Sequence, residues 1–167
     1  MGSEMCIGDR LAFLLGSSSG CEAHHLVAPL PGQALSHQLV ERLFGKLNQK
    51  GLSASTATVD WLCLHATGTE RFDREEMAFV LRAFPQLPWI TAMKRSLGHG
   101  LGAAGVVEAA LIIEGLKRAE VPPWPSAVDP ALGLPERPTQ PPPRPKLALQ
   151  LACGMGGVSV INLFANA

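Results

Sequence analysis

Residues 93–117 constrain the fold of this chain more than any other stretch. They carry Lys94 and His99 and then run directly into small and apolar residues at helical spacing. Three glycines bracket His99, so the backbone can turn sharply there and another group can approach closely. From Ala103 onward, apolar residues cover most of the circumference, which predicts a helix packed on both sides in the protein interior.

This arrangement places His99 near the first turn of the predicted helix. The positive end of the helix dipole disfavours an imidazolium, so we expect a neutral ring near pH 7. A neutral imidazole in this position can donate a hydrogen bond to a carbonyl oxygen or a developing oxyanion. A capping or packing role is the alternative, and this stretch alone leaves both interpretations open.

Length and charge limit the number of domains and the kinds of partner that this chain can have. A chain of 167 residues can form one domain with a real core, and we assign residues 1–167 to a single domain. The net charge is zero, with 14 basic and 14 acidic residues, which argues against a nucleic-acid-binding surface. Only 17% of residues are charged, so we expect another chain or domain to cover part of the surface.

Membrane, export and metal signals are weak. The longest apolar helix is interrupted by Glu108 and Glu114 and is too short to span a bilayer. The first residues carry neither a basic nor an apolar signal-peptide region, and none of the four cysteines forms a CxxC pair. We therefore expect a cytoplasmic protein with buried reduced thiols, no membrane association and no metal site.

Hydrophobic periodicity predicts an α/β fold. Short apolar runs predict strands at 10–18, 59–64, 89–92, 146–152 and 158–164. Four-residue spacing of apolar side chains predicts helices at 33–50, at 73–84 and from 103. Asp73 and Glu76 have the spacing of a helix-capping box. Strands this apolar indicate a mixed, mostly parallel sheet that helices cover on both faces.

Two connections have unusual composition. Residues 122–145 contain ten prolines, which exclude regular helix and central strand. They form an extended excursion, either a covering loop, which we favour, or a ligand for a partner domain. The glycine-rich link at 154–157 joins two strands and predicts a hairpin or a closely approached turn.

Three loops follow the carboxyl ends of predicted strands, where open α/β sheets place their ligands. They carry His65, then Lys94 with His99, then the 154–157 turn. Two histidines and a lysine can form an acid/base or oxyanion site. No nucleophile accompanies them: Cys21 lies where a strand leaves into a loop, which differs from a strand-to-helix nucleophile elbow.

Several motifs, in order along nearly the whole chain, together suggest a family. They are residues 65–69 (His-Ala-Thr-Gly-Thr) followed by Asp73 and Glu76, residues 94–99 (Lys-Arg-Ser-Leu-Gly-His), residues 102–105 (Gly-Ala-Ala-Gly) followed by Glu108, residues 121–123 (Val-Pro-Pro) and residues 154–157 (Gly-Met-Gly-Gly). The chain resembles the C-terminal half of the β-ketoacyl-acyl-carrier-protein synthases, condensing enzymes of fatty-acid and polyketide synthesis with the thiolase fold.

The resemblance implies roles for individual residues. His65 and His99 would be the two histidines of a Cys-His-His triad, polarising a malonyl thioester carbonyl and stabilising the enolate formed on decarboxylation. Lys94 would set the local electrostatics with Glu108 as counter-charge, and Asp73 would support the site. Four residues are implied to bind substrate. Thr67 and Thr69 would hydrogen-bond the phosphopantetheine arm. Gly154 and Met155 would lie at the thioester, where the Met155 N–H would be an oxyanion-hole donor.

The resemblance also implies partners. The protein itself would bind no cofactor, because the substrates are carried on the phosphopantetheine of acyl carrier protein. The other expected partner is a Cys-bearing N-terminal half or a partner synthase subunit, in a dimer. The half that carries the family's nucleophilic cysteine is absent, so an apolar face should be exposed toward it.

The chain departs from the family motifs at two positions, and two alternative functions stay open. Ala66 stands where the family has glycine, and Met155 replaces the usual phenylalanine. Besides an enzyme part, the chain could be a non-catalytic partner of the chain-length-factor type or an inactive truncated fragment. The retained His65, Lys94 and His99 favour descent from a catalytic protein.

Overall fold

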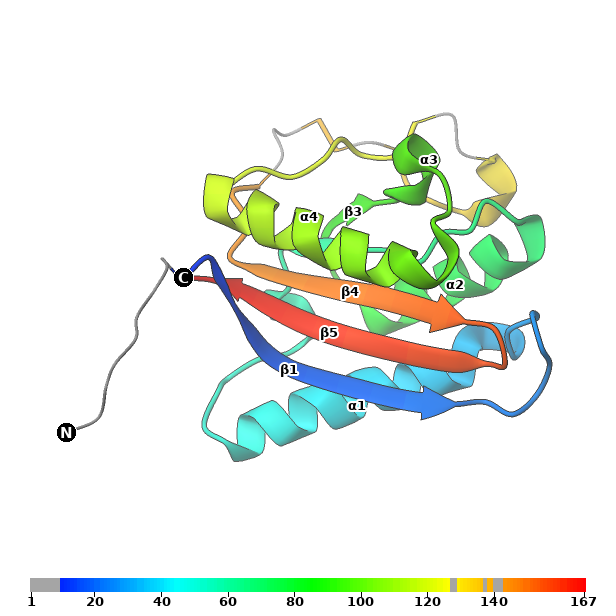
Figure 1. Cartoon of the computed structure of the whole chain (residues 1–167), viewed down its shortest axis with the longest axis horizontal. Coiled ribbons are helices and arrows are strands. Elements are labelled where there is room, and N and C mark those ends of the chain that lie inside the picture. The colour runs from blue at the N-terminus through cyan, green and yellow to red at the C-terminus, as the bar shows by residue number, and fades with distance from the viewer. Residues whose placement is uncertain (1–9, 127–128, 137, 140–142) are drawn as a thin grey trace.

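A five-stranded sheet forms the centre of the protein (Figure 1). The computed structural model describes residues 10–126, 129–136, 138–139 and 143–167. In spatial order the strands are β1 (Ala12–Cys21), β5 (Val158–Asn166), β4 (Leu147–Gly154), β2 (Trp61–Cys63) and β3 (Trp89–Thr91). Only β5 runs against the others, because it pairs antiparallel with both β1 and β4 while β4, β2 and β3 pair in parallel. The prediction of a mixed, mostly parallel sheet is confirmed.

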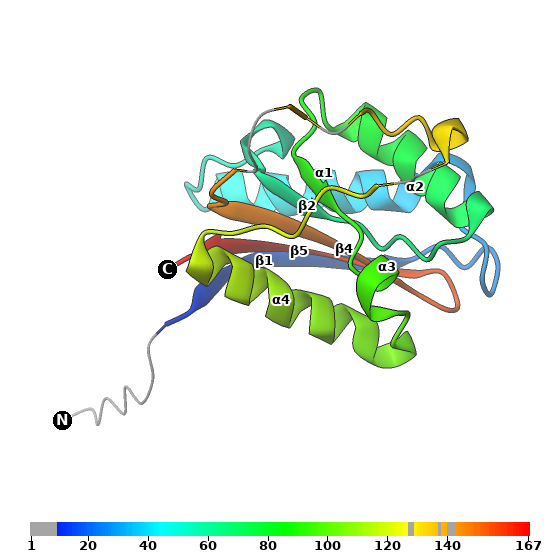
Figure 2. The same ribbon diagram turned by 90° about the horizontal axis from the view of Figure 1, so that it is seen from above.

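Helices cover both faces of this sheet, as the sequence predicts (Figure 2). Helices α1 (Ala34–Gln49) and α2 (Glu70–Ala83) lie on one face, and α4 (Ala104–Arg118) lies on the other. The short helix α3 (Lys94–Leu97) follows β3. Four 3-10 turns complete the described elements: η1 (Pro31–Gln33), η2 (Thr56–Thr58), η3 (Leu101–Ala103) and η4 (Pro130–Leu132).

Each face of the sheet has its own apolar cluster. The larger cluster lies under α1 and α2 and includes Leu39, Leu43, Leu62, Phe79 and Leu149. The smaller cluster lies under α4 and consists of Trp61, Cys63, Met93, Ile112, Leu116, Ala148 and Phe164. Alternate residues of β2 therefore pack into the apolar clusters on opposite faces of the sheet, which explains why this short strand is apolar throughout.

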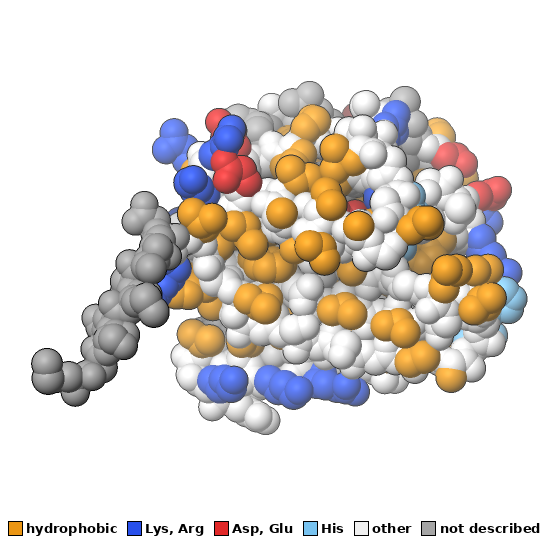
Figure 3. Space-filling view, in the orientation of Figure 1, with side chains coloured by type: hydrophobic (Ala, Val, Ile, Leu, Met, Phe, Trp, Pro, Cys, Tyr) orange, Lys and Arg blue, Asp and Glu red, His pale blue; other side chains and the backbone are white. Residues whose placement is uncertain are grey.

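Helix α4 is buried on one side only, so the prediction of a helix packed on both sides is wrong for this chain. The buried residues Ala104, Glu108, Ile112 and Leu116 recur every four positions and face the sheet. On the opposite side Val106 is 73% exposed. We call the exposed side chains of this region the apolar face: Leu97, Leu101, Val106, Val107 and Leu111. Figure 3 shows hydrophobic side chains over this part of the surface, which confirms the expected exposed apolar face.

Strand β1 is one of the two edge strands of the sheet, and the expectation that every strand is buried on both faces is wrong here. Most of its side chains are partly or fully exposed, and Ser18 is the buried one. One face of β1 packs against α1, so closely that a Cβ atom at Gly16 would lie 2.8 Å from a methyl carbon of Leu43. Glycine at this position therefore permits the contact between strand and helix.

The proline-rich excursion is anchored to the domain. The indole N–H of Trp89 donates to the Pro122 carbonyl at 2.8 Å, and the rings of Trp89 and Trp124 pack edge to face with centroids 5.5 Å apart. Leu132 and Leu134 pack against the larger apolar cluster. The described part of residues 122–145 is therefore a covering loop.

No described helix has the length and hydropathy to cross a membrane, and the described residues contain no metal-binding cluster of histidine, cysteine and carboxylate side chains. The expectation that all cysteines are buried is wrong for Cys21, which is exposed at the end of β1. Cys6 lies outside the described residues.

Candidate functional site

The three loops predicted to meet do come together at one edge of the sheet. Strands β2, β3 and β4 are parallel neighbours, so their carboxyl ends share that edge. His65 follows β2, while Lys94 and His99 follow β3. The imidazole rings of His65 and His99 lie edge to face, with centroids 5.8 Å apart.

His65 is buried and held from several directions. Its backbone N–H and that of Ala66 each donate to the Glu76 carboxylate at 2.8 Å. The Cys153 N–H donates to the His65 Nδ1 atom at 3.2 Å. An imidazole that accepts at Nδ1 carries its proton on Nε2, so His65 is a neutral Nε2–H donor. Burial, with Lys94 and His99 adding to it, lowers the pKa of His65 to about 3.

His99 is exposed in the described chain and has the same tautomer as His65. The Leu101 N–H donates to the His99 Nδ1 atom at 3.1 Å, which leaves the proton on Nε2. His99 lies near the start of α4, as expected, but outside the helix, because α4 begins at Ala104 after the turn η3. The local hydrogen bond, and not the helix dipole, selects the donor form.

A buried ion pair lies behind the histidines. The Lys94 Nζ atom lies 2.5 Å from the Glu108 Oε1 atom, and the two side chains are only 4% and 2% exposed. Lys94 also donates to the His65 carbonyl oxygen at 2.5 Å. The sequence places Lys94 in a loop, but the residue belongs to α3, and its ammonium group reaches the His65 carbonyl and Glu108. The lysine and the glutamate therefore have the arrangement that the sequence predicts.

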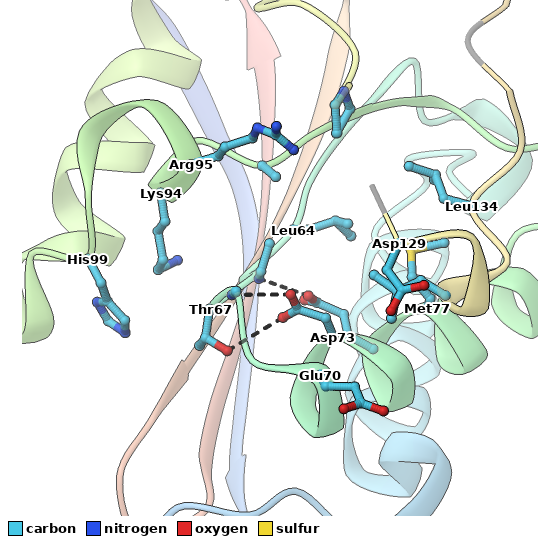
Figure 4. Close-up of a pocket in the computed structure, with 16 residues that line it drawn as sticks. Leu64, Thr67, Glu70, Asp73, Met77, Lys94, Arg95, His99, Asp129 and Leu134 are labelled. Atoms are coloured by element: carbon cyan, nitrogen blue, oxygen red, sulfur yellow. Dashed lines mark hydrogen bonds between the residues drawn. The ribbon is translucent and has the colours of Figure 1, made fainter. Parts of the chain in front are cut away.

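The loop between β2 and α2 is braced by Asp73 (Figure 4). The Gly68 N–H donates to this carboxylate at 3.1 Å and the Thr67 hydroxyl at 3.4 Å. The Thr67 and Thr69 hydroxyl oxygens lie 2.9 Å apart. The predicted helix start at Asp73 is wrong, because α2 begins at Glu70. Asp73 thus supports the threonine loop and Glu76 supports His65, in place of the capping box suggested by their spacing.

Ala66 has a backbone conformation that favours glycine. Its φ angle is 40°, in the left-handed region where a Cβ atom is strained. Glu76 holds the Ala66 N–H on the same loop. The departure from the family glycine therefore falls on a strained residue beside His65.

The 154–157 link is a hairpin turn between β4 and β5, as predicted. It is tied to the segment after β1, because the Gly156 N–H donates to the Leu26 carbonyl at 2.7 Å and the Glu22 N–H donates to the Gly157 carbonyl at 2.9 Å. The Met155 side chain is 73% exposed. Gly154 and Met155 directly follow Cys153, whose N–H bonds to His65, so the turn begins beside this histidine.

A cavity of about 430 Å³ lies between α2, α3 and the proline-rich loop (Figure 4). Thr67, Asp73, Lys94 and His99 line it on the polar side. Apolar side chains of Leu64, Met77, Leu132 and Leu134 line the remainder. Thr69, Gly154 and Met155 do not line this cavity. His99 lines the cavity, whereas His65 does not. The arrangement suits an amphipathic chain whose carbonyl group meets His99.

Sequence reasoning missed two residues near the site. Arg95 lines the cavity beside Lys94, and the Phe72 ring packs edge-on against His65 with centroids 5.1 Å apart. Phe72 fell outside the predicted helix, which began one residue later. Its spacing of four residues from Glu76 was the available signal, because residues four apart share one helix face.

None of the described thiols has the features of an activated nucleophile. Burial raises the pKa of Cys63 far above its ordinary range and that of Cys153 to about 12. Cys21 is exposed, and its Sγ atom lies 3.1 Å from the Gly156 carbonyl oxygen. Reactive cysteines need an electropositive setting that stabilises the thiolate, and a carbonyl oxygen does the opposite.

Known proteins resemble this chain along most of its length. The family described as "Beta-ketoacyl synthase, C-terminal domain" matches residues 11–127. The 3-oxoacyl-[acyl-carrier-protein] synthase 2 of Mycobacterium leprae is 32% identical over 159 residues, which are 92% of this chain and 36% of that protein. The chloroplastic 3-oxoacyl-[acyl-carrier-protein] synthase II of Arabidopsis thaliana is 30% identical over 160 residues, 92% of this chain and 29% of that protein.

The fold has solved counterparts as well. A structure described as a ketosynthase (ApeO) in complex with its chain length factor (ApeC) from Xenorhabdus doucetiae superimposes with a TM-score of 0.80 and 27% identity. The match covers 96% of this chain and 40% of that one. The chain thus spans about a third of the length of the curated relatives it matches. On this evidence of sequence and fold, the chain belongs to the β-ketoacyl synthase C-terminal domain family.

Proposed function

We propose that this chain supplies the decarboxylation half of a condensing-enzyme active site and works with a Cys-bearing half. One observation carries the proposal: His65 and His99 both accept a backbone N–H at Nδ1, which makes both rings neutral Nε2–H donors, and their ring centroids lie 5.8 Å apart. Paired neutral donors suit an oxygen that gains negative charge during a reaction.

The reaction is a decarboxylative Claisen condensation. The bond between the malonyl carboxylate and the α-carbon breaks, CO₂ leaves, and the electron pair moves into the thioester enolate. The Nε2–H groups of His65 and His99 donate to the enolate oxygen. The α-carbon then attacks the acyl thioester on the cysteine of the other half, and the cysteine leaves as a thiolate.

Lys94 supports this chemistry without contacting the reacting atoms. Its charge lies behind His65, where it disfavours protonation of that ring. Glu108 neutralises the ammonium group, so the buried site carries a paired charge. Thr67 lines the cavity and its hydroxyl lies 2.9 Å from that of Thr69 on the same loop, so the pair is suitably placed to hydrogen-bond the amide groups of a phosphopantetheine arm.

The partners follow from the same proposal. The relatives are named as synthases acting on acyl carrier protein, so we assign the thioester substrates to that carrier. The apolar face on α4 suits the Cys-bearing half or a partner synthase subunit, and the working assembly would be a dimer located in the cytoplasm.

The test reconstitutes the site. This chain is co-expressed with a Cys-bearing N-terminal half from the family, the complex is purified, and release of labelled CO₂ from malonyl-acyl carrier protein is measured. We expect decarboxylation that falls about 10²–10³-fold in His65→Ala and in His99→Ala, the loss typical of one oxyanion donor. His24→Ala changes an exposed histidine of the β1–α1 connection and serves as the control.

Two results would refute the proposal. A purified complex that decarboxylates malonyl thioester equally well with His99→Ala would show that His99 has no such role. A complex that forms but never decarboxylates would instead support the non-catalytic, chain-length-factor type of partner.

A further inference from the structure

Helix α2 presents two side chains to His65 from one of its faces. Glu76 accepts the His65 backbone N–H at 2.8 Å. Phe72, four residues earlier, packs edge-on against the imidazole with centroids 5.1 Å apart and an interplanar angle of 62°. Residues four apart on a helix point the same way, so one rigid element holds both the backbone and the ring of this histidine.

Phe72, which packs against His65, also lines a second, smaller cavity. This cavity of about 30 Å³ lies between the segment after β1 and the 154–157 turn. Phe72, Cys153 and Gly154 line it, whereas His65 does not. Its volume is enough for a water molecule, which needs roughly 10–15 Å³ of such space. The phenyl ring therefore borders both the imidazole and a water-sized space.

The hydrogen bond from the Cys153 N–H selects the tautomer of His65. The Cys153 N–H donates to Nδ1 at 3.2 Å, at the long end of the range for such bonds. A long bond is easily replaced when water reaches the acceptor. Cys153 itself lines the small cavity, so only the neighbouring side chains keep water from this bond.

We propose that Phe72 is a positioning residue that keeps His65 in its Nε2–H form by excluding water from the bond between the Cys153 N–H and Nδ1. Without the ring, water enters the enlarged cavity, where its oxygen can accept a hydrogen bond from the Nδ1–H tautomer and so stabilise that form. The neutral imidazole has one proton, so a proton on Nδ1 is missing from Nε2. The donor directed toward the substrate is then lost.

The tautomer of His65 can be tested on this chain alone. Nitrogen-15 spectra of the imidazole report which nitrogen carries the proton, and hydrogen exchange reports protection of the Cys153 amide. We expect Phe72→Ala to populate the Nδ1–H form and to speed Cys153 exchange about tenfold or more. Phe72→Leu keeps an apolar side chain there and should preserve the wild-type tautomer. Phe13→Ala removes a phenyl ring from β1 and is the matched control.

A second, less drastic substitution keeps the test decisive if the first variant does not fold. If Phe72→Ala does not fold, Phe72→Val still removes much of the ring and gives the same two readouts. Folded variants with an unchanged His65 tautomer and unchanged Cys153 exchange would overturn the inference.

The catalytic consequence rests on the proposed function. In the reconstituted complex, Phe72→Ala should lower kcat for decarboxylation with little change in KM, because the defect lies in the donor and not in binding. Failure of the two halves to react would count against the proposed function, whereas a normal tautomer in the isolated variant would count against the role of Phe72.

Discussion

The Lys94 Nζ atom lies 2.5 Å from the Glu108 Oε1 atom and 2.5 Å from the His65 carbonyl oxygen. One buried cation therefore joins three separate elements: α3, α4 and the loop after β2. Among the described residues, the second Glu108 oxygen has no hydrogen-bond partner, so the lysine is the main compensation for that carboxylate.

Removing the lysine should destabilise the fold strongly. Lys94→Met keeps an apolar side chain of similar length but leaves Glu108 buried and unpaired, which should lower the free energy of unfolding by about 3–5 kcal/mol in urea titrations. The double variant with Glu108→Gln should recover much of the loss. Arg118→Met removes one partner of the exposed pair with Glu114 and should change little. Equal losses in the buried and exposed pairs would contradict this prediction.

His65 should make the fold sensitive to acid. Its pKa is about 3 in the folded chain, against an ordinary value of 6.5. Between these values the unfolded chain binds the proton and the folded chain does not, so stability falls as pH drops from about 6.5 toward 3. At pH 4 the penalty is on the order of 3 kcal/mol. Unfolding of wild type and His65→Gln at pH 7.5 and pH 4 measures it: the variant should lose less stability, and parallel losses would refute the assignment.

Ala66→Gly should stabilise the chain although it deletes a methyl group. The φ angle of 40° strains alanine and suits glycine, so relief of strain should exceed the added freedom of the unfolded chain. We expect a gain of up to about 1 kcal/mol in the free energy of unfolding. Ala78→Gly, in the interior of α2, should instead lose about 1 kcal/mol. Loss of stability in both variants would show that Ala66 is not strained.

The apolar face should matter for assembly and not for folding. Val106 is 73% exposed, so Val106→Glu should leave the melting temperature of the isolated chain nearly unchanged. The same charge should prevent co-purification with the Cys-bearing half, because it would be buried without a partner. Leu52→Glu, at another exposed apolar position, is the control and should co-purify normally. Co-purification of Val106→Glu at the wild-type level would place the interface elsewhere.

Much of the fold was predictable because local pattern and burial agree. The apolar runs of β2, β3 and β4 predict buried parallel strands, and these strands bring His65 and Lys94 to one edge of the sheet. Predictions failed where a neighbouring element decides the outcome. The start of α2 is one example: Asp73 resembles a cap in sequence, but in three dimensions its carboxylate braces Gly68 in the preceding loop.

The sequence by itself determined the order of the elements and the loops that carry the site, because these depend on residue type and spacing, whereas the pairing of Lys94 with Glu108 was implied by the family resemblance. Only the tertiary structure decided which histidine nitrogen carries the proton. That choice depends on backbone N–H groups, one from Cys153, 88 residues away along the chain, and one from Leu101, two residues away. Likewise, the apolar residues around most of the circumference of the helix in residues 93–117 predict burial on both sides, but only the packed sheet shows which side of α4 it covers and which side it leaves exposed.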